Sequence, residues 1–265
     1  MSYVSRQVSV VALLVLCASP SFAQTQRTFT LWPNPPPPAP PVTPDLLQLG
    51  GRVYRGACLQ CHGEKGDGQG RELKNLAIPP RDFTAGTFII RSTPLGSLPL
   101  DSDLFGSIRR GFQPDVGMPS FTFLSDNEVW AVIAYIKTFS ERWKNEQPKP
   151  AVEIPPPPAE TAALVGPGRI VFMSMGACFV CHGMNGLGDG PAGMGTAYTV
   201  GAHKGRRVPP ANFAKLKNLK GGARPEDIYR SISTGLDGTP MPSFGHLTPE
   251  QRWQLVFFIL SLNKA

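Results

Sequence analysis

The chain has 265 residues, 41% of them hydrophobic, which suffices for one large domain or two small ones. It carries 26 basic and 19 acidic residues, a formal net charge of +7. No clustered Lys/Arg stretch with interleaved aromatic residues occurs, which argues against nucleic acid as a partner. The basic charge favours a protein partner with an acidic docking face.

The first 23 residues are typical of a secretory signal peptide. Arg6 precedes an apolar run from Val8 to Leu16, and small residues then end in Ser21-Phe22-Ala23. We assign residues 1–23 to a signal peptide and expect a periplasmic or otherwise extracytoplasmic location. The run is short for a membrane span, although an uncleaved signal would tether the chain to a bilayer. No other segment is long and apolar enough, so the mature chain should reach a membrane only through a complex.

Five cysteines are present, and Cys17 lies in the signal segment. A lipidated Cys17 is an alternative, but Leu16 is bulky where a small residue is expected before such a cysteine. The remaining cysteines form two close pairs, at 58 and 61 and at 178 and 181. This spacing, rather than the number of cysteines, carries the functional information.

Two proline-rich stretches, Pro33–Pro44 and Pro148–Pro158, punctuate the chain. Their prolines favour extended polyproline II, so they should act as semi-rigid spacers on either side of a compact unit. A ligand for a proline-recognising domain is the alternative. We therefore expect a proline-rich flexible segment at 24–45, a first domain at 46–145, a proline-rich linker at 146–160 and a second domain at 161–265.

The two halves carry the same landmarks in the same order, beginning at Gly51-Arg52 and at Gly168-Arg169. Each has a short helical segment, a Cys-x-x-Cys-His-Gly motif, a Gly-Asp-Gly turn, a double proline, a helix before a glycine stop, a Met-Pro-Ser-Phe loop and a closing helix. The second half has extra residues around 192–207, between its histidine and its double proline. A duplication of one mainly helical domain explains this order, so we predict an all-α fold.

The closing helices begin with Ser125-x-x-Glu128 and Thr248-x-x-Gln251, both of capping-box form. Trp130 and Trp253 occupy the same place in these helices. A tryptophan in an amphipathic helix is typical of core packing, which we favour over a role as an electron relay.

Cys58-Leu59-Gln60-Cys61-His62 and Cys178-Phe179-Val180-Cys181-His182 match the attachment pattern of c-type haem. In that pattern the paired thiols form thioethers with the haem vinyl groups, and the following histidine coordinates the iron. A thioredoxin-like dithiol, a disulfide or a zinc site would leave the histidine and the duplicated methionine loop unexplained. Two covalently bound haem c groups are therefore expected.

For the sixth iron ligand, Met118 is the candidate in the first domain, where it is the only methionine and His62 the only histidine. In the second domain, Met241 repeats the Met-Pro-Ser-Phe context at the matching place. A bis-histidine site remains an alternative there. The competing residues of the second domain are Met173, Met175, Met184, Met194, His203 and His246.

On these residues the sequence resembles the class I cytochrome c family over nearly all of both halves. The resemblance implies two tandem domains in which an amino-terminal helix crosses a carboxy-terminal one, with haem in a crevice. It also implies that a proline carbonyl orients each proximal histidine, which nominates Pro79 or Pro80 and Pro209 or Pro210. Carried over, the proximal ligands would be His62 and His182, the distal ligands Met118 and Met241, and the attachment points Cys58, Cys61, Cys178 and Cys181.

Histidine and methionine would fill both axial positions of each iron and leave none open for a substrate. We therefore expect an electron carrier rather than a catalyst, with no catalytic residue and with two haems forming a relay between exported or membrane-bound redox partners. A cytochrome subunit of a dehydrogenase or oxidase complex would fit this role. The alternatives are a peroxidase-like dihaem enzyme with one open haem site, and a haem-based sensor or assembly factor.

Overall fold

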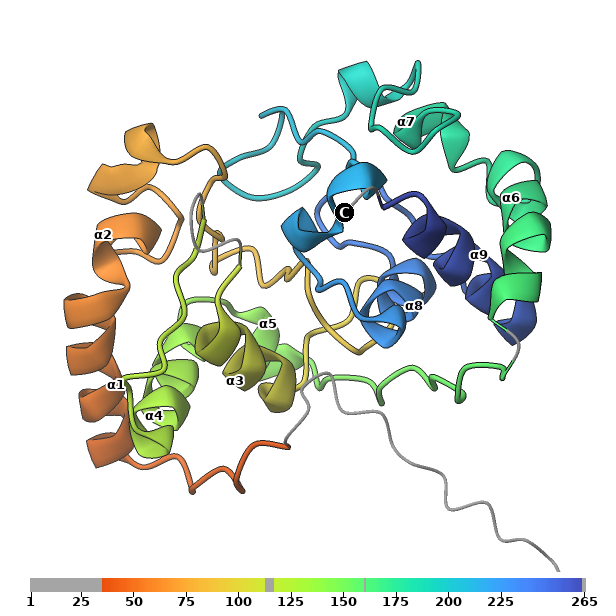
Figure 1. The fold of residues 1–265 in the computed structure, drawn as a ribbon. Coiled ribbons are helices and arrows are strands. Elements are labelled where there is room, and N and C mark those ends of the chain that lie inside the picture. The colour runs from red at the N-terminus through yellow and green to blue at the C-terminus, as the bar shows by residue number, and fades with distance from the viewer. Residues whose placement is uncertain (1–34, 113–116, 160, 264–265) are drawn as a thin grey trace, which may run out of the picture.

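The computed structural model describes residues 35–112, 117–159 and 161–263, and within these ranges the chain is helical and has no β-strand. Two units lie side by side, and the proline-rich linker runs from one to the other along the lower edge of the view (Figure 1). This arrangement confirms the predicted all-α fold, whereas the predicted signal peptide at 1–23 lies outside the described residues. Domain one contains α1 (Pro44–Ala57), α2 (Leu59–His62), α3 (Asp101–Arg110), α4 (Asp126–Lys137) and α5 (Arg142–Asn145), and domain two contains α6 (Val165–Met173), α7 (Phe179–His182), α8 (Pro225–Thr234) and α9 (Pro249–Ser261).

The starts of α4 and α9 are the capping boxes that the sequence predicts. The Ser125 hydroxyl accepts from the Glu128 amide, and the Glu128 carboxylate accepts from the Ser125 amide at 2.8 Å. Thr248 and Gln251 make the same reciprocal pair. Each pair satisfies backbone N–H groups that have no partner within the helix, and so fixes where the helix begins.

In each domain the first helix crosses the closing helix, α1 on α4 in domain one and α6 on α9 in domain two. A single glycine at each crossing sets how closely the two helices approach. A Cβ on Gly50 would lie 2.1 Å from the Ala131 carbonyl oxygen, and a Cβ on Gly168 would lie 2.0 Å from that of Gln254. Only glycine permits such an approach of helix backbones. The structural repeat therefore matches Gly168 with Gly50, one residue before the Gly51-Arg52 pair that the sequence comparison used.

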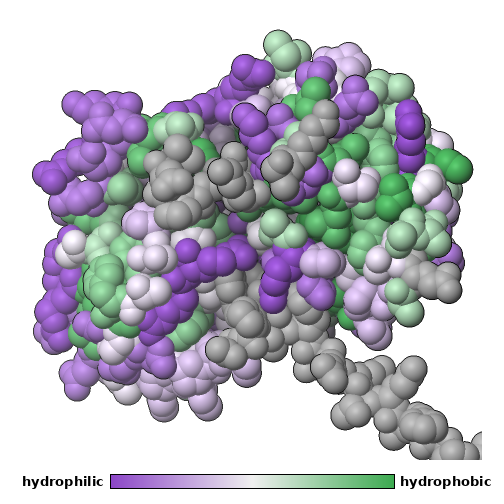
Figure 2. All heavy atoms as spheres, viewed as in Figure 1, coloured by the Kyte–Doolittle hydropathy of each residue, from purple (hydrophilic) through white to green (hydrophobic). Residues whose placement is uncertain are grey.

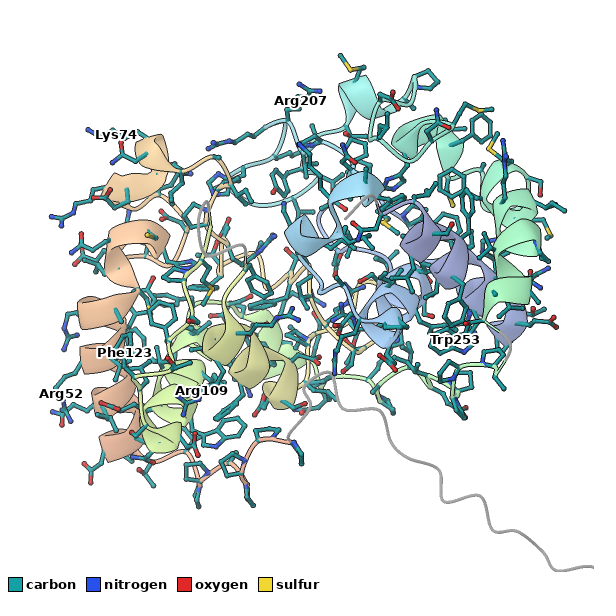
Figure 3. The ribbon with its side chains drawn as sticks, viewed as in Figure 1. Arg52, Lys74, Arg109, Phe123, Arg207 and Trp253 are labelled. Carbon is teal, nitrogen blue, oxygen red and sulfur yellow. The ribbon has the colours of Figure 1, made fainter. Side chains whose placement is uncertain are left out.

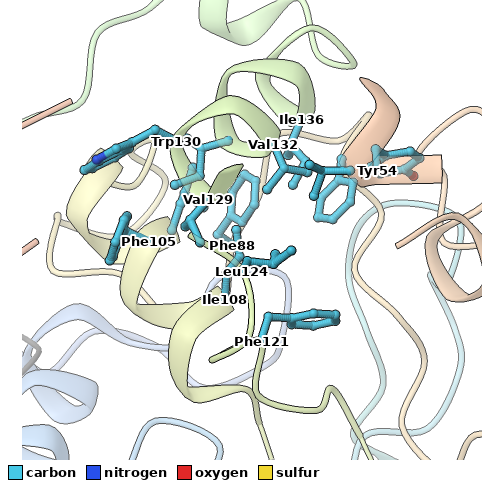
Figure 4. Packing of buried hydrophobic residues seen from close by; sticks show 14 residues of the cluster. Tyr54, Phe88, Phe105, Ile108, Phe121, Leu124, Val129, Trp130, Val132 and Ile136 are labelled. Atoms are coloured by element: carbon cyan, nitrogen blue, oxygen red, sulfur yellow. The ribbon is translucent and has the colours of Figure 1, made fainter. Parts of the chain in front are cut away.

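Each domain has its own apolar core, and the core of domain one is drawn in Figure 4. The closing-helix tryptophans take part in these cores, as predicted. Trp130 packs on Phe105 of α3 with 4.6 Å between ring centroids, and Trp253 packs on Tyr229 of α8 at the same distance. The equivalent pairs show that helix packing, as well as sequence order, is duplicated.

The linker lies against both domains. The Val152 amide donates to the Ser92 carbonyl at 2.8 Å, and the Lys149 amide donates to the Ser97 hydroxyl at 3.1 Å. Ile154 packs against the core of domain two. The extended form expected of prolines is present, but these contacts dock the linker on the surface instead of leaving it as a free spacer.

The domains also contact each other directly. Ile89 and Ile90 of domain one form an apolar cluster with Tyr198 of domain two. Beside it, the fully buried Arg91 donates to the Thr234 carbonyl at 2.9 Å, across the interface. Buried apolar area and a buried charge with carbonyl partners both oppose separation of the domains. None of the helices in the described ranges combines the length and apolar character needed to cross a bilayer.

Candidate functional site

In domain one, the end of α1 and the single turn of α2 present the first cysteine motif. Cys58 and Cys61 are half-buried free thiols one helical turn apart. The His62 ring is buried and stacks on Phe83 with 4.4 Å between centroids. Its Nδ1–H donates to the Arg81 carbonyl at 2.9 Å. This bond fixes the ring and leaves Nε2 as the atom available to a metal.

Domain two repeats this arrangement. Cys178 and Cys181 are free thiols on either side of the start of α7, and His182 follows at its end. The His182 ring stacks on Phe213 at 4.5 Å, and its Nδ1–H donates to the Ala211 carbonyl at 3.1 Å. Both histidines are thus oriented by a backbone oxygen two residues before the aromatic ring on which they stack.

The prediction that a proline carbonyl orients each histidine is wrong. The acceptors are the carbonyls of Arg81 and Ala211, each of which directly follows a double proline. Any residue offers a carbonyl, so the acceptor's identity leaves no side-chain signature. The matching position after each double proline is the signal that could have located it.

The Gly-Asp-Gly turns hold the segment after each histidine. The Gly68 amide donates to the His62 carbonyl at 2.8 Å, and the Gly188 amide donates to the His182 carbonyl at the same distance. Gly68 and Gly188 have φ of +74° and +79°, which favour glycine. The Asp67 side chain accepts from the Gln69 amide at 3.0 Å, as turn-forming aspartates do.

The two methionine loops also have the same hydrogen bonds. The Phe112 amide donates to the Met118 carbonyl at 2.7 Å, and the Leu236 amide donates to the Met241 carbonyl at 3.1 Å. In each domain the phenylalanine three residues after the methionine is tied to the preceding helix, with Phe121 bonded to Ile108 and Phe244 to Ile232. Each loop is therefore anchored at both ends.

In domain two these groups meet around a cavity of about 730 Å³, lined by both cysteines, His182 and Met241. Its size is that of sites for organic ligands and cofactors. The walls are mainly apolar, and polar side chains such as Lys220 and Asn212 also line it. Two thiols, one imidazole and one thioether in such a cavity fit a covalently held haem.

Domain one supplies part of this second cavity. Ala77, Ile78, Pro79 and Ile89 line it together with the residues of domain two. Pro79 lies two residues before Arg81, whose carbonyl holds His62. One short segment of domain one therefore serves both sites, which the duplicated pattern of the sequence did not reveal.

Burial determines the protonation of the site residues. Burial lowers the pKa of His62 to about 4, because its effect outweighs that of the hydrogen bond to the Arg81 carbonyl, which raises the pKa. Burial also lowers the pKa of His182. Both imidazoles are therefore neutral at pH 7, as a metal ligand requires. Burial raises the pKa of Cys58 and of Cys178 to about 12, so these free thiols lack the acidity of a redox-active dithiol.

The competing ligands of domain two lie elsewhere. Of its methionines, Met241 alone lines the cavity, and neither His203 nor His246 does. His203 donates from Nε2 to the Pro80 carbonyl of domain one at 3.0 Å, and His246 is exposed beside Phe244. The exposed Met175, Met184 and Met194 belong to the apolar side chains on the surface of domain two.

The surfaces of the two domains differ. Figure 2 shows hydrophilic residues over much of domain one and more hydrophobic residues over domain two. Figure 3 shows Arg52 and Lys74 on the outer side of domain one, and Arg207 at the top between the domains. Arg207 also lines the domain-two cavity.

Comparison with known proteins agrees with this geometry. The family described as cytochrome c oxidase, cbb3-type, subunit III matches residues 45–136, and the family described as cytochrome c matches residues 167–263. A chain from the reducing HAO-like protein complex of Kuenenia stuttgartiensis has 34% sequence identity and a TM-score of 0.79. The match covers 86% of this chain and 100% of that one. No curated protein sequence matches.

The chain belongs to the class I c-type cytochrome family. This cytochrome has two tandem domains and binds two haem c groups, as the duplicated Cys-x-x-Cys-His motifs predict. It is a dihaem electron-transfer protein.

Proposed function

We propose that His62 and Met118 ligate the iron of domain one, that His182 and Met241 ligate the iron of domain two, and that the four paired cysteines hold the haems. The observation that carries this proposal is the single cavity lined by Cys178, Cys181, His182 and Met241. Domain one repeats the hydrogen bonds made by the histidine ring and by the methionine carbonyl, which extends the proposal to that domain. With both axial positions filled, each iron exchanges electrons and does not bind a substrate.

The proposed role is a relay between exported redox partners, as a subunit docked on a larger oxidoreductase complex. The whole of a related chain from a reducing HAO-like complex is matched at 34% identity, which supports a partner of that kind. Removal of residues 1–23 and a periplasmic location belong to the same proposal. Association with a membrane would then occur through the complex.

The ligation is tested on the mature, oxidised protein by the weak far-red absorption band of methionine-ligated ferric haem, with pyridine haemochrome quantitation. Two haems per chain, both with the band, are expected. A haem that lacks the band and binds carbon monoxide in the native protein would refute the relay and support a peroxidase-like enzyme or a sensor.

The partner is tested by purifying tagged cytochrome from its native cells and identifying what co-purifies in stoichiometric amount. A multihaem oxidoreductase that reduces or oxidises the cytochrome in vitro is expected. The intact mass measured on the same sample should correspond to a chain that begins at Gln24. A chain that purifies alone, retains residues 1–23 and exchanges no electrons with candidate oxidoreductases would contradict this part of the proposal.

A further inference from the structure

Residues 192–207 of domain two, the insertion segment, lie against the histidine-orienting segment of domain one. Gly68 and Gly188 make the same hydrogen bond to the histidine carbonyl of their domain. Pro79 follows Gly68 by 11 residues, whereas Pro209 follows Gly188 by 21, so the insertion segment has no full counterpart in domain one. It contributes three hydrogen bonds across the interface, from Arg206 to the Leu76 carbonyl at 3.2 Å, from His203 to the Pro80 carbonyl at 3.0 Å and from the Ala202 amide to Asp82 Oδ2 at 2.7 Å.

Two of these bonds bracket the carbonyl that holds His62. Pro80 and Asp82 are the residues immediately before and after Arg81, and domain two is bonded to both. The other domain therefore holds the peptide unit before Arg81 and the side chain of the residue after it. The direction of the Arg81 carbonyl determines how well that carbonyl accepts the hydrogen bond from His62.

Domain one has an aspartate at a position where domain two has an asparagine, and this difference fits the contact between the domains. Asp82 Oδ1 accepts from the Thr84 amide at 2.9 Å, and Asn212 Oδ1 accepts from the Ala214 amide at the same distance. Both side chains thus make the same local turn. The carboxylate of Asp82 has a second acceptor oxygen, which takes the Ala202 amide, whereas an asparagine has no second oxygen to offer.

The contact is tight and partly buried. A Cβ on Gly68 would lie 2.7 Å from His203 Nε2, and a Cβ on Gly201 would lie 2.9 Å from Asp82 Oδ2. The space left between Arg81, Asp82 and His203 is a cavity of about 10 Å³, room for one water at most. Partial shielding from water strengthens these two hydrogen bonds relative to fully exposed ones.

We propose that the insertion segment is a positioning element for the haem of domain one, in which His203 and the Ala202 amide fix the Arg81 carbonyl and so set the reduction potential of that haem. The inference rests on the proposed ligation by His62. A carbonyl that accepts from the ligand imidazole raises its basicity, which stabilises ferric iron and lowers the potential. Domain two thereby tunes the iron of domain one through a backbone hydrogen bond.

The test compares His203→Ala with His203→Gln, which keeps an N–H donor, and with His246→Ala as a matched control. Potentials of the two haems are measured separately by a redox titration followed by NMR, with the domain-one signals assigned by their change in Met118→His. His203→Ala should shift the domain-one equilibrium toward ferrous iron by up to tenfold, about 59 mV for one electron. His203→Gln should keep the domain-one potential close to that of the unaltered protein. His246→Ala should leave the potentials of both haems unchanged.

A second readout reports on the proposed bond itself. The His62 Nδ1–H signal of the ferrous protein should shift in His203→Ala and also in Asp82→Asn, which removes the acceptor for Ala202. An unchanged domain-one potential and Nδ1–H signal in His203→Ala would overturn the inference, and so would an equal shift of both haems. Absence of the methionine band from the domain-one haem of the unaltered protein would instead refute the ligation proposal.

Discussion

Replacement of Gly50 by alanine should separate the two terminal helices of domain one. An added Cβ would lie 2.1 Å from the Ala131 carbonyl oxygen and 2.9 Å from the Tyr135 Cβ. Both belong to the framework of α4 and cannot rotate away. Room for the methyl group therefore requires a shift of α1 relative to α4.

The size of the effect follows from a matched position in the same helix. Gly56 has nothing within 4 Å of an added Cβ, so Gly56→Ala should raise the free energy of unfolding by up to about 1 kcal/mol through helix propensity alone. Overpacking costs ~1–3 kcal/mol, and contact with backbone favours the upper end. We expect Gly50→Ala to lower the unfolding free energy by ~2 kcal/mol, which places the two variants about 3 kcal/mol apart.

Urea unfolding of the holoprotein measures this difference, with circular dichroism and haem absorbance recorded together so that the unfolding of each domain is resolved. The slope with denaturant should be unchanged, because the same surface is exposed on unfolding. Equal stability of Gly50→Ala and Gly56→Ala would refute the close helix crossing as a source of specificity in this fold.

Further predictions concern a proposed iron ligand, a helix cap and a buried hydrogen bond. Met241→Ala should remove the methionine band of one haem, lower the potential of that haem and open it to carbon monoxide, as followed by absorbance. Hydrogen bonds from the Ser125 amide and hydroxyl lower the pKa of Glu128 below its ordinary 4.5, so their stabilisation is present above that pH and lost as pH falls through the lower folded-state value. The stability of Glu128→Gln should therefore fall less on acidification. Tyr54→Phe removes a 2.7 Å bond to the Gly63 carbonyl and should cost ~1–2 kcal/mol in urea unfolding.

The local elements could be predicted because their signals are local. The capping boxes at Ser125 and Thr248 define helix starts through residues only three positions apart. The cysteine motifs fix the attachment chemistry within five residues, and repetition of each landmark supplied an internal check. Burial of Trp130 followed from its place in an amphipathic helix.

Contacts between the domains could not be predicted in this way. The insertion segment was visible only as extra length, because its bonds join Ala202 and His203 to residues about 120 positions earlier. A comparison of the two halves aligns each residue with its counterpart, so it cannot reveal what one half does to the other. For the same reason the sequence did not predict the buried Arg91 at the interface or the contribution of Pro79 to the domain-two cavity.

The wall that Ala77, Ile78, Pro79 and Ile89 contribute to the domain-two cavity bears on biogenesis. Domains generally fold as units, the amino-terminal one first. Domain two then completes its cavity against a surface that already exists, much as a subunit completes a shared site in an oligomer. A fragment starting at residue 161 would have all of its own proposed attachment and ligand residues and would still leave that cavity open to water on one side.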